Sequence, residues 1–180
     1  MKLSIRDLII CSLFASITAI LSQIAIPIPF TTVPLTMQVL AVMLCGMLLG
    51  SKLGFISQVI YLLIGAIGIP VFAQMSGGPG ALFGPTGGFL VSFPIAAFII
   101  GHFSQQHKSK MSVILGIILG LVIIYIIGTL QFCLITKMSF INGLMACVLP
   151  FVLIDLIKVG LAYAIGSSIC KRVNIGIRTC

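Results

Sequence analysis

The chain has 180 residues, of which 60% are hydrophobic and only 7% charged, and its mean hydropathy is +1.33. A soluble domain carries roughly 25% charged residues, so a water-soluble fold of this composition would expose large apolar patches and aggregate. The net charge of +8 comes from basic residues spread between apolar runs, unlike the clustered basic face of a nucleic-acid-binding protein. We therefore expect one integral membrane domain over residues 1–180, surrounded by a lipid bilayer.

Six apolar runs, separated by polar, proline-rich or glycine-rich breaks, predict an all-α bundle of six transmembrane helices. Crossing a hydrocarbon core takes roughly 20 residues. The predicted spans are residues 8–26, 35–49, 53–69, 89–103, 111–134 and 150–169. Basic residues precede the first run, as in a signal peptide, but its 19 residues are long enough to span and predict a retained helix.

The basic residues also predict the orientation of the bundle. If the N-terminus is placed inside, eight Lys and Arg residues fall inside and only Lys137 falls outside, while Lys158 lies within the last span. Cytoplasmic loops carry an excess of Lys and Arg. Both termini are therefore predicted to be cytoplasmic, in a multi-pass protein of the cell membrane.

The chain has only two acidic residues, Asp7 and Asp155. Asp7 follows Ser4 by three residues just before an apolar run, which is typical of a capping box at a helix start. Asp155 lies inside the last apolar run, three residues before Lys158, so both side chains share one helix face.

A charge inside a membrane span is costly and is by default a functional hypothesis, although a structural ion pair is the alternative. Asp155 precedes the predicted cytoplasmic end of its helix at Lys171 by 16 residues, or about 24 Å of helix. This predicts a site in the outer part of the bilayer.

A glycine-rich run over residues 77–88 holds six glycines in twelve residues and falls on the outer side by the charge pattern. Glycine permits unusual backbone angles and close approach of the backbone to a ligand, although a plain flexible loop is an equal alternative. The run contains no lysine, and the chain has no G-x-x-x-x-G-K-[ST] motif. The sequence therefore shows no means of hydrolysing ATP.

Small residues recur along the first span at positions where another helix can approach closely. They are Ser12, Ala15, Ser16 and Ala19. Packing inside the bundle is the alternative to a contact with a separate protein. The sequence brings together no nucleophile with a base and no metal-ligating cluster, so neither an enzyme nor a metal site is expected.

Four motifs together resemble the BioY family, the biotin-binding S components of energy-coupling factor (ECF) transporters. The motifs are Pro-Leu-Thr-Met-Gln at 34–38, the run 62–72, Phe-Gly-Pro-Thr-Gly-Gly-Phe at 83–89, and Pro150-Phe151 ahead of the Asp-x-x-Lys of Asp155 and Lys158. The resemblance covers nearly the whole chain in order and spacing.

The resemblance implies a six-helix protein that binds biotin near the outer face, without a cofactor. Asp155 and Lys158 would belong to the pocket, under loops that join the first two spans and the third and fourth spans. Ala15 and Ala19 would contact a membrane coupling subunit that joins two ATPases, and the chain would topple in the bilayer to release biotin. The predicted substrate-binding residues are Gln74, Gly78, Phe83, Gly84, Thr86, Gly87, Asp155 and Lys158, and the predicted partner contacts are Ser12, Ala15, Ser16 and Ala19.

Biotin matches the chemistry of the pair in the last span. Asp155 can accept the ureido N–H groups, and Lys158 can donate either to the ureido oxygen or to the valerate carboxylate. Two alternatives stay open. The chain could bind another small vitamin, or it could be a self-sufficient secondary transporter, which would predict inverted repeats or a polar path through both leaflets.

Overall fold

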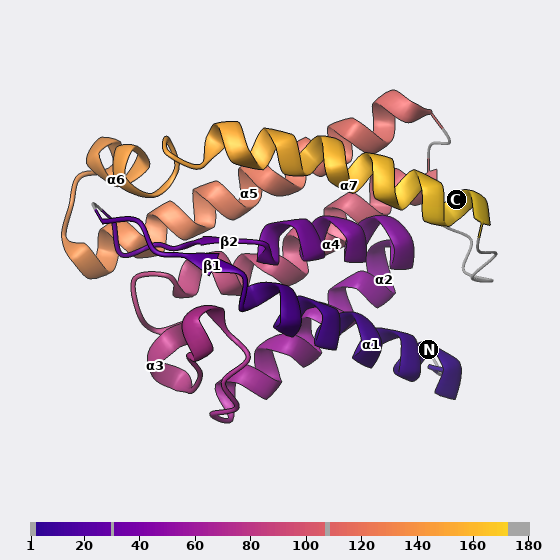
Figure 1. Cartoon of the computed structure of the whole chain (residues 1–180), viewed down its shortest axis with the longest axis horizontal. Helices are drawn as coiled ribbons and strands as arrows, with labels where there is room; N and C mark the ends of the chain where they lie inside the picture. Colours follow the sequence, from indigo (N-terminus) through magenta and orange to yellow (C-terminus); the bar gives the residue numbers. More distant parts are fainter. Residues whose placement is uncertain (1–2, 30, 107–108, 173–180) are drawn as a thin grey trace.

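The computed structural model describes residues 3–29, 31–106 and 109–172 as a bundle of long helices (Figure 1). Five helices in these ranges are long and apolar enough to cross a membrane. They are α1 (Ile5–Ser22), α2 (Gln38–Ala66), α4 (Gly87–Gln106), α5 (Lys110–Thr136) and α7 (Val152–Arg172). Short elements complete the described chain: β1 (Ala25–Ile26), β2 (Leu35–Thr36), η1 (Ala73–Met75), α3 (Pro79–Leu82) and α6 (Phe140–Cys147).

Helix α2 consists of two arms that fold back on each other at Gly50. The backbone of Gly50 is not helical, with φ 77° and ψ −176°, a conformation that favours glycine. Residues on either side of it come together in pairs: a Cβ on Gly54 would lie 3.3 Å from the Cα of Gly46, and Gln38 Nε2 donates to the Tyr61 hydroxyl at 2.6 Å. The break coincides with the turn predicted between residues 49 and 53.

The predicted ends of the first three spans were wrong by several residues. Residues 25–26 belong to β1 and not to the first helix, and residues 35–36 belong to β2, which pairs with β1 in antiparallel fashion. Pro27 explains the first difference, because a residue that precedes proline disfavours the helical region. The second arm of α2 ends at Ala66 and not at residue 69, because Gly68 adopts φ 103° and closes the helix.

Two segments predicted as loops contain short helices. The run 73–88 includes η1 and α3, the second of which begins with Pro79 in its first turn, a favoured place for proline. Before the last span, Ser139 caps α6 by accepting a hydrogen bond from the Asn142 amide. The last helix then starts at Val152 and runs to Arg172, so the predicted span 150–169 was slightly displaced.

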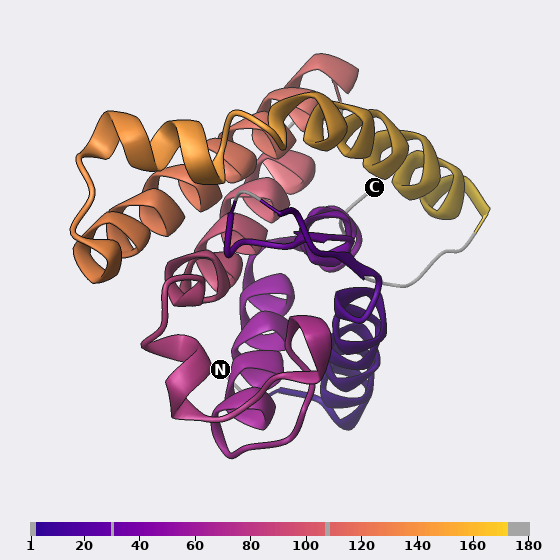
Figure 2. The same ribbon diagram turned by 60° about the vertical axis from the view of Figure 1, so that its left-hand side comes forward.

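Helix α4 lies between α2 and α5, and glycines allow these helices to approach closely. A Cβ on Gly46 of α2 would lie 2.7 Å from the Ala97 carbonyl oxygen of α4, and one on Gly120 of α5 would lie 2.6 Å from an Ile100 side-chain carbon. Helix α7 crosses the other side of the first arm of α2 (Figures 1 and 2). The start of α1 and the end of α7 share one end of the bundle, whereas α3, α6 and the β1–β2 ribbon lie at the other.

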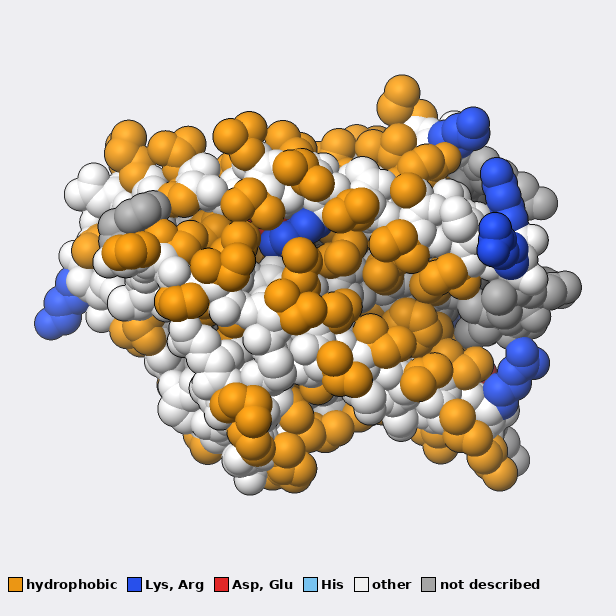
Figure 3. Space-filling view, in the orientation of Figure 1, with side chains coloured by type: hydrophobic (Ala, Val, Ile, Leu, Met, Phe, Trp, Pro, Cys, Tyr) orange, Lys and Arg blue, Asp and Glu red, His pale blue; other side chains and the backbone are white. Residues whose placement is uncertain are grey.

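The outer surface is that of an integral membrane protein. Large apolar side chains are exposed along the length of α5 and α7, including Leu115, Val122, Leu130, Leu156 and Leu161. Hydrophobic atoms cover the middle of the molecule in Figure 3, and most Lys and Arg side chains gather at its two ends. The predicted capping box of α1 is confirmed, since Ser4 and Asp7 each bond the backbone of the other.

Candidate functional site

A buried ion pair lies in the first turns of α7. Lys158 Nζ is 2.6 Å from Asp155 Oδ1, and the two residues are only 2% and 3% exposed. The i, i+3 spacing brings the side chains together on the face of α7 that is turned into the bundle. The charge pair that the sequence predicted is thus formed and enclosed by protein.

Two further elements hold this pair in place. From α5, the Tyr125 hydroxyl donates to Asp155 Oδ2 at 2.6 Å. From β2, the Thr36 carbonyl accepts from Lys158 Nζ at 2.7 Å. Tyr125 was not predicted from the sequence as a site residue. A tyrosine in an otherwise apolar span nevertheless indicates a polar group nearby, because a buried hydroxyl usually has a hydrogen-bond partner.

The pair retains hydrogen-bonding capacity. A lysine ammonium has three N–H donors, and Asp155 and Thr36 take two of those on Lys158. A carboxylate has about four lone-pair sites, of which Lys158 and Tyr125 occupy one on each oxygen of Asp155. The pair can therefore both donate to and accept from a neutral molecule placed beside it.

A cavity of about 140 Å³ opens beside the ion pair. This is roughly ten times the ~10–15 Å³ that one water molecule requires, so the cavity is large enough for a small organic molecule. Residues from the segment before β2, from β2, α2, α3, α4, α5, α6 and α7, and from residues 72–76 form its lining. The apolar walls include Val33, Leu35, Val39, Phe72, Phe89, Leu90, Phe93, Ile124 and Phe151, and the polar side chains are Thr32, Thr36, Gln38, Gln74, Ser76, Thr86, Tyr125, Asp155 and Lys158.

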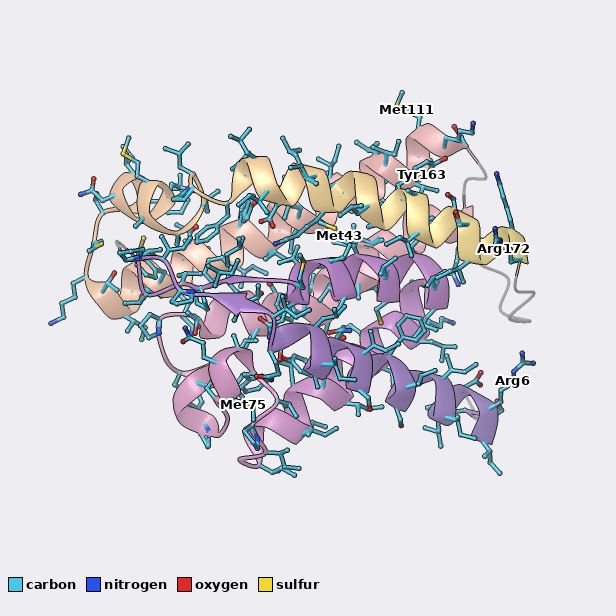
Figure 4. All side chains as sticks on the ribbon, viewed as in Figure 1. Arg6, Met43, Met75, Met111, Tyr163 and Arg172 are labelled. Atoms are coloured by element: carbon cyan, nitrogen blue, oxygen red, sulfur yellow. The ribbon has the colours of Figure 1, made fainter. Side chains whose placement is uncertain are left out.

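Residues 72–76, which we call the strap, form one wall of the cavity. Its ends pair with each other as an isolated bridge between Phe72 and Ser76. Between them Gln74 and Met75 adopt φ 58° and 55°, a left-handed conformation that costs about 1–2 kcal/mol in a residue with a side chain. Met75 lies at the exposed tip (Figure 4).

The end of α1 fastens the strap. Gln23 Nε2 donates to the Phe72 carbonyl, and the Met75 amide donates to Gln23 Oε1, both at 3.1 Å. Next to it, the Ser22 hydroxyl donates to the Val71 carbonyl at 2.7 Å. One amide side chain therefore holds both sides of a strained segment.

A second chain of hydrogen bonds orients Gln38 toward the cavity. Its Nε2 donates to the Tyr61 hydroxyl, which donates to the Val71 carbonyl at 3.0 Å. Thr36 donates its hydroxyl to Gln38 Oε1 at 3.2 Å. Thr36 and Gln38 both lie in the 34–38 motif that carries the family resemblance. The apolar pattern of the sequence did not predict that this motif forms the end of a strand and the start of a helix.

The predicted substrate-binding residues separate into two groups. Gln74, Thr86, Asp155 and Lys158 line the cavity. The other four are not part of its lining: Gly78 and Phe83 flank α3, Gly84 follows it, and Gly87 begins α4. Phe83 is 77% exposed, the Gly78 amide donates to the Gly65 carbonyl, and Gly84 and Gly87 pack around the Gln131 side chain.

The predicted partner contacts on α1 face different ways. Ala15 is buried in the core of this chain, and Ala19 packs against the same core. Ser12 and Ser16 are exposed, and their hydroxyls bond to backbone carbonyls one turn earlier in α1.

Among the described residues, no three His, Cys, Asp or Glu side chains group closely enough to hold a metal ion.

The sequence and the fold are both similar to known proteins. A profile of the BioY family matches residues 1–175. A probable biotin transporter BioY of Pyrococcus horikoshii is 40% identical over 160 residues, which are 89% of this chain and 93% of that protein. The biotin transporter BioY of Thermotoga maritima is 36% identical over 166 residues, or 92% and 96% of the two chains.

A solved structure has nearly the same fold. The crystal structure of an S-component for biotin from an ECF-type ABC transporter superposes with a TM-score of 0.90 at 25% identity. The superposition covers 98% of this chain and 96% of the other.

Proposed function

The chain belongs to the BioY family, and from this premise we propose that it is the biotin-binding membrane subunit, or S component, of an ECF-type ABC transporter. The observation that carries the proposal is the enclosed Asp155–Lys158 pair at one wall of a cavity lined mainly by apolar side chains. Apolar walls with a few convergent polar groups are the usual design of a small-molecule site. The chain is a transport protein and not an enzyme.

The two arms of α2 each cross the membrane in this proposal. Together with α1, α4, α5 and α7 they give six spans, so both termini lie on the same side of the cell membrane. The basic residues at the end of the bundle that carries Arg6 and Arg172 support the proposal that this side is the cytoplasmic one (Figure 4). Three of the eight residues in the charge count, Lys2, Lys108 and Arg178, lie outside the described residues.

This orientation opens the cavity toward the exterior. Lys137, the one basic residue predicted outside, follows α5 at the end opposite Arg172, and the cavity lies toward that end because Asp155 is in the first turns of α7. A ligand would enter between the strap and the β1–β2 ribbon.

The ureido ring of biotin binds at the ion pair. This ring is neutral and carries two N–H donors and one carbonyl, which matches the lone pairs left on Asp155 and the N–H left on Lys158. The valerate carboxylate would be repelled by Asp155, so it points away from the pair. Neutral donors elsewhere in the lining, on Gln74 and Thr86, are available to it.

The apolar part of biotin packs on the aromatic walls. Phe72, Phe89, Phe93 and Phe151 supply flat surfaces for the thiophane ring and the aliphatic chain. Gly78, Phe83, Gly84 and Gly87 act in this proposal by shaping the α3 segment that adjoins the cavity, and not by direct contact with a ligand enclosed in it.

A membrane coupling subunit and two ATPases complete the transporter in this proposal. The chain itself has no phosphate-binding loop. Ser12 and Ser16 present an exposed, small-residue face on α1, which allows a partner helix to approach closely. Ala15 and Ala19 support that face from the inside.

A binding titration separates this function from its alternatives. The detergent-purified protein is titrated with biotin and with a panel of other vitamins, with thermal stabilisation as the second readout. We expect saturable binding of biotin alone. A preference for a different vitamin would identify another substrate, and uptake into vesicles by this chain without ATPases would indicate a secondary transporter.

A further inference from the structure

Tyr61 lies behind the wall of the cavity, in the second arm of α2. Its side chain is fully buried and is not part of the cavity lining. The ring packs edge to face on Phe72, with centroids 5.5 Å apart, and Phe72 does line the cavity. A buried tyrosine hydroxyl needs polar partners, and those of Tyr61 belong to the cavity wall and to the residue that leads into the strap.

The hydroxyl of Tyr61 has a fixed direction. It lies 3.0 Å from the Val71 carbonyl oxygen, and two oxygens at this distance share a proton. The carbonyl has no proton of its own, so the tyrosine donates its only one there, and its oxygen is left to accept. The neighbouring Gln38 must then present an N–H group to this oxygen, as it does at 2.6 Å.

The orientation of the Gln38 amide follows from this direction. With Nε2 at Tyr61, its Oε1 accepts from the Thr36 hydroxyl at 3.2 Å, and the backbone carbonyl of the same threonine binds Lys158. Gln38 is only 5% exposed and lines the cavity. An amide has two N–H groups and two lone pairs, of which Tyr61 and Thr36 use one each. The remaining N–H and lone pair are available to a ligand beside the ion pair.

We propose that Tyr61 is a positioning residue of the binding site: without touching the ligand, its hydroxyl fixes the Gln38 amide in the one orientation that meets the polar groups of the ligand. Without this hydroxyl, a buried N–H loses its partner, and the amide has to be ordered again each time a ligand binds. The inference rests on the proposed function, because it concerns the same cavity.

Tyr61→Phe tests the inference by titration calorimetry with biotin on the detergent-purified full-length protein. The phenyl ring keeps its packing on Phe72, and the Ser22 hydroxyl still donates to the Val71 carbonyl. We expect biotin binding to weaken about fivefold, the factor that one ordinary hydrogen bond contributes. Tyr163→Phe in α7, which packs on the core outside the cavity, is the matched control and should bind biotin as the wild-type protein does.

A double-mutant cycle separates positioning from a general loss of packing. In the Gln38→Met background the amide is absent, so the addition of Tyr61→Phe should change the dissociation constant by less than about twofold. A merely structural role of Tyr61 would weaken binding by the same factor in both backgrounds, and that result would overturn the proposal. Wild-type affinity in Tyr61→Phe would overturn it as well.

Thr36→Val loosens the same amide from its other side and replaces Tyr61→Phe in the test if that variant does not fold. It keeps the backbone carbonyl that binds Lys158. We expect a similar loss of biotin affinity, and an unchanged affinity would contradict the role given to the fixed amide. If the wild-type protein binds another vitamin and not biotin, the proposed function fails, and the same cycle with that vitamin tests Tyr61 separately.

Discussion

The substitution Asp155→Asn tests the role of the ion pair most sharply, because it changes charge and hydrogen-bond direction without changing side-chain size. The asparagine carbonyl still accepts from Lys158, and the Tyr125 hydroxyl can turn to accept from the new amide group. These hydrogen bonds offset part of the cost of leaving the buried Lys158 ammonium without its anion, and the unfolding midpoint of the variant is measured before its binding. A ureido ring beside this site, however, loses a charged acceptor and faces an N–H group in place of an oxygen.

The expected loss follows from the value of one hydrogen bond to a charged group, about 1–3 kcal/mol. This corresponds to roughly 5- to 150-fold in the dissociation constant for biotin, measured by titration calorimetry on the purified protein. Tyr125→Phe, which removes one donor to Asp155, should give a smaller loss. Asp7→Asn makes the same change at the start of α1 and is the matched control. If Asp155→Asn and Asp7→Asn bind biotin within twofold of each other, the proposed role of Asp155 is refuted.

Three further predictions concern stability and kinetics. Lys158→Met leaves Asp155 buried without its cation and should cost about 3–5 kcal/mol in a reversible unfolding measurement; an unchanged midpoint would contradict the burial seen for the pair. Gln23→Ala removes hydrogen bonds to both sides of the strap, each worth roughly 1 kcal/mol. It should speed biotin dissociation by up to about thirtyfold in stopped-flow chase experiments, whereas an unchanged rate would show that the strap does not control ligand exit. Gly46→Ala forces a Cβ against α4 and should lower the free energy of unfolding by about 1–3 kcal/mol. The control Gly160→Ala in α7 places its Cβ where no atom lies within 4 Å, so it should raise the free energy of unfolding slightly. A larger loss for Gly160→Ala than for Gly46→Ala would show that α2 and α4 are not in close contact.

The apolar pattern located the long helices, since α4, α5 and α7 each contain a predicted core with ends displaced by only a few residues. Helix ends that are determined by a nearby proline were harder to predict. Residues 25–26 and 35–36 are apolar enough to continue a helix, but prolines on the connecting segment favour extended backbone, and the two pieces pair as strands.

The site was only partly predictable because its parts are distant in sequence. Asp155 and Lys158 stood out as charges in an apolar run, and their spacing predicted their contact. The Thr36 carbonyl that binds Lys158 lies 122 residues away along the chain, and no local pattern indicates such a contact. The glycine-rich run 77–88 predicted unusual backbone, and Gly78 does adopt φ 86°. The strap just before it was not predicted, because its two left-handed residues, Gln74 and Met75, are not glycines.

The central claim is that biotin occupies the cavity between the strap, β2 and the start of α7. An experimental structure of the purified protein with biotin tests it directly. The ureido ring is predicted within hydrogen-bonding distance of the Asp155 carboxylate and the Lys158 ammonium, with the thiophane ring against the phenylalanine walls. Biotin bound outside this cavity, or with its ureido ring turned away from both side chains, would contradict the account.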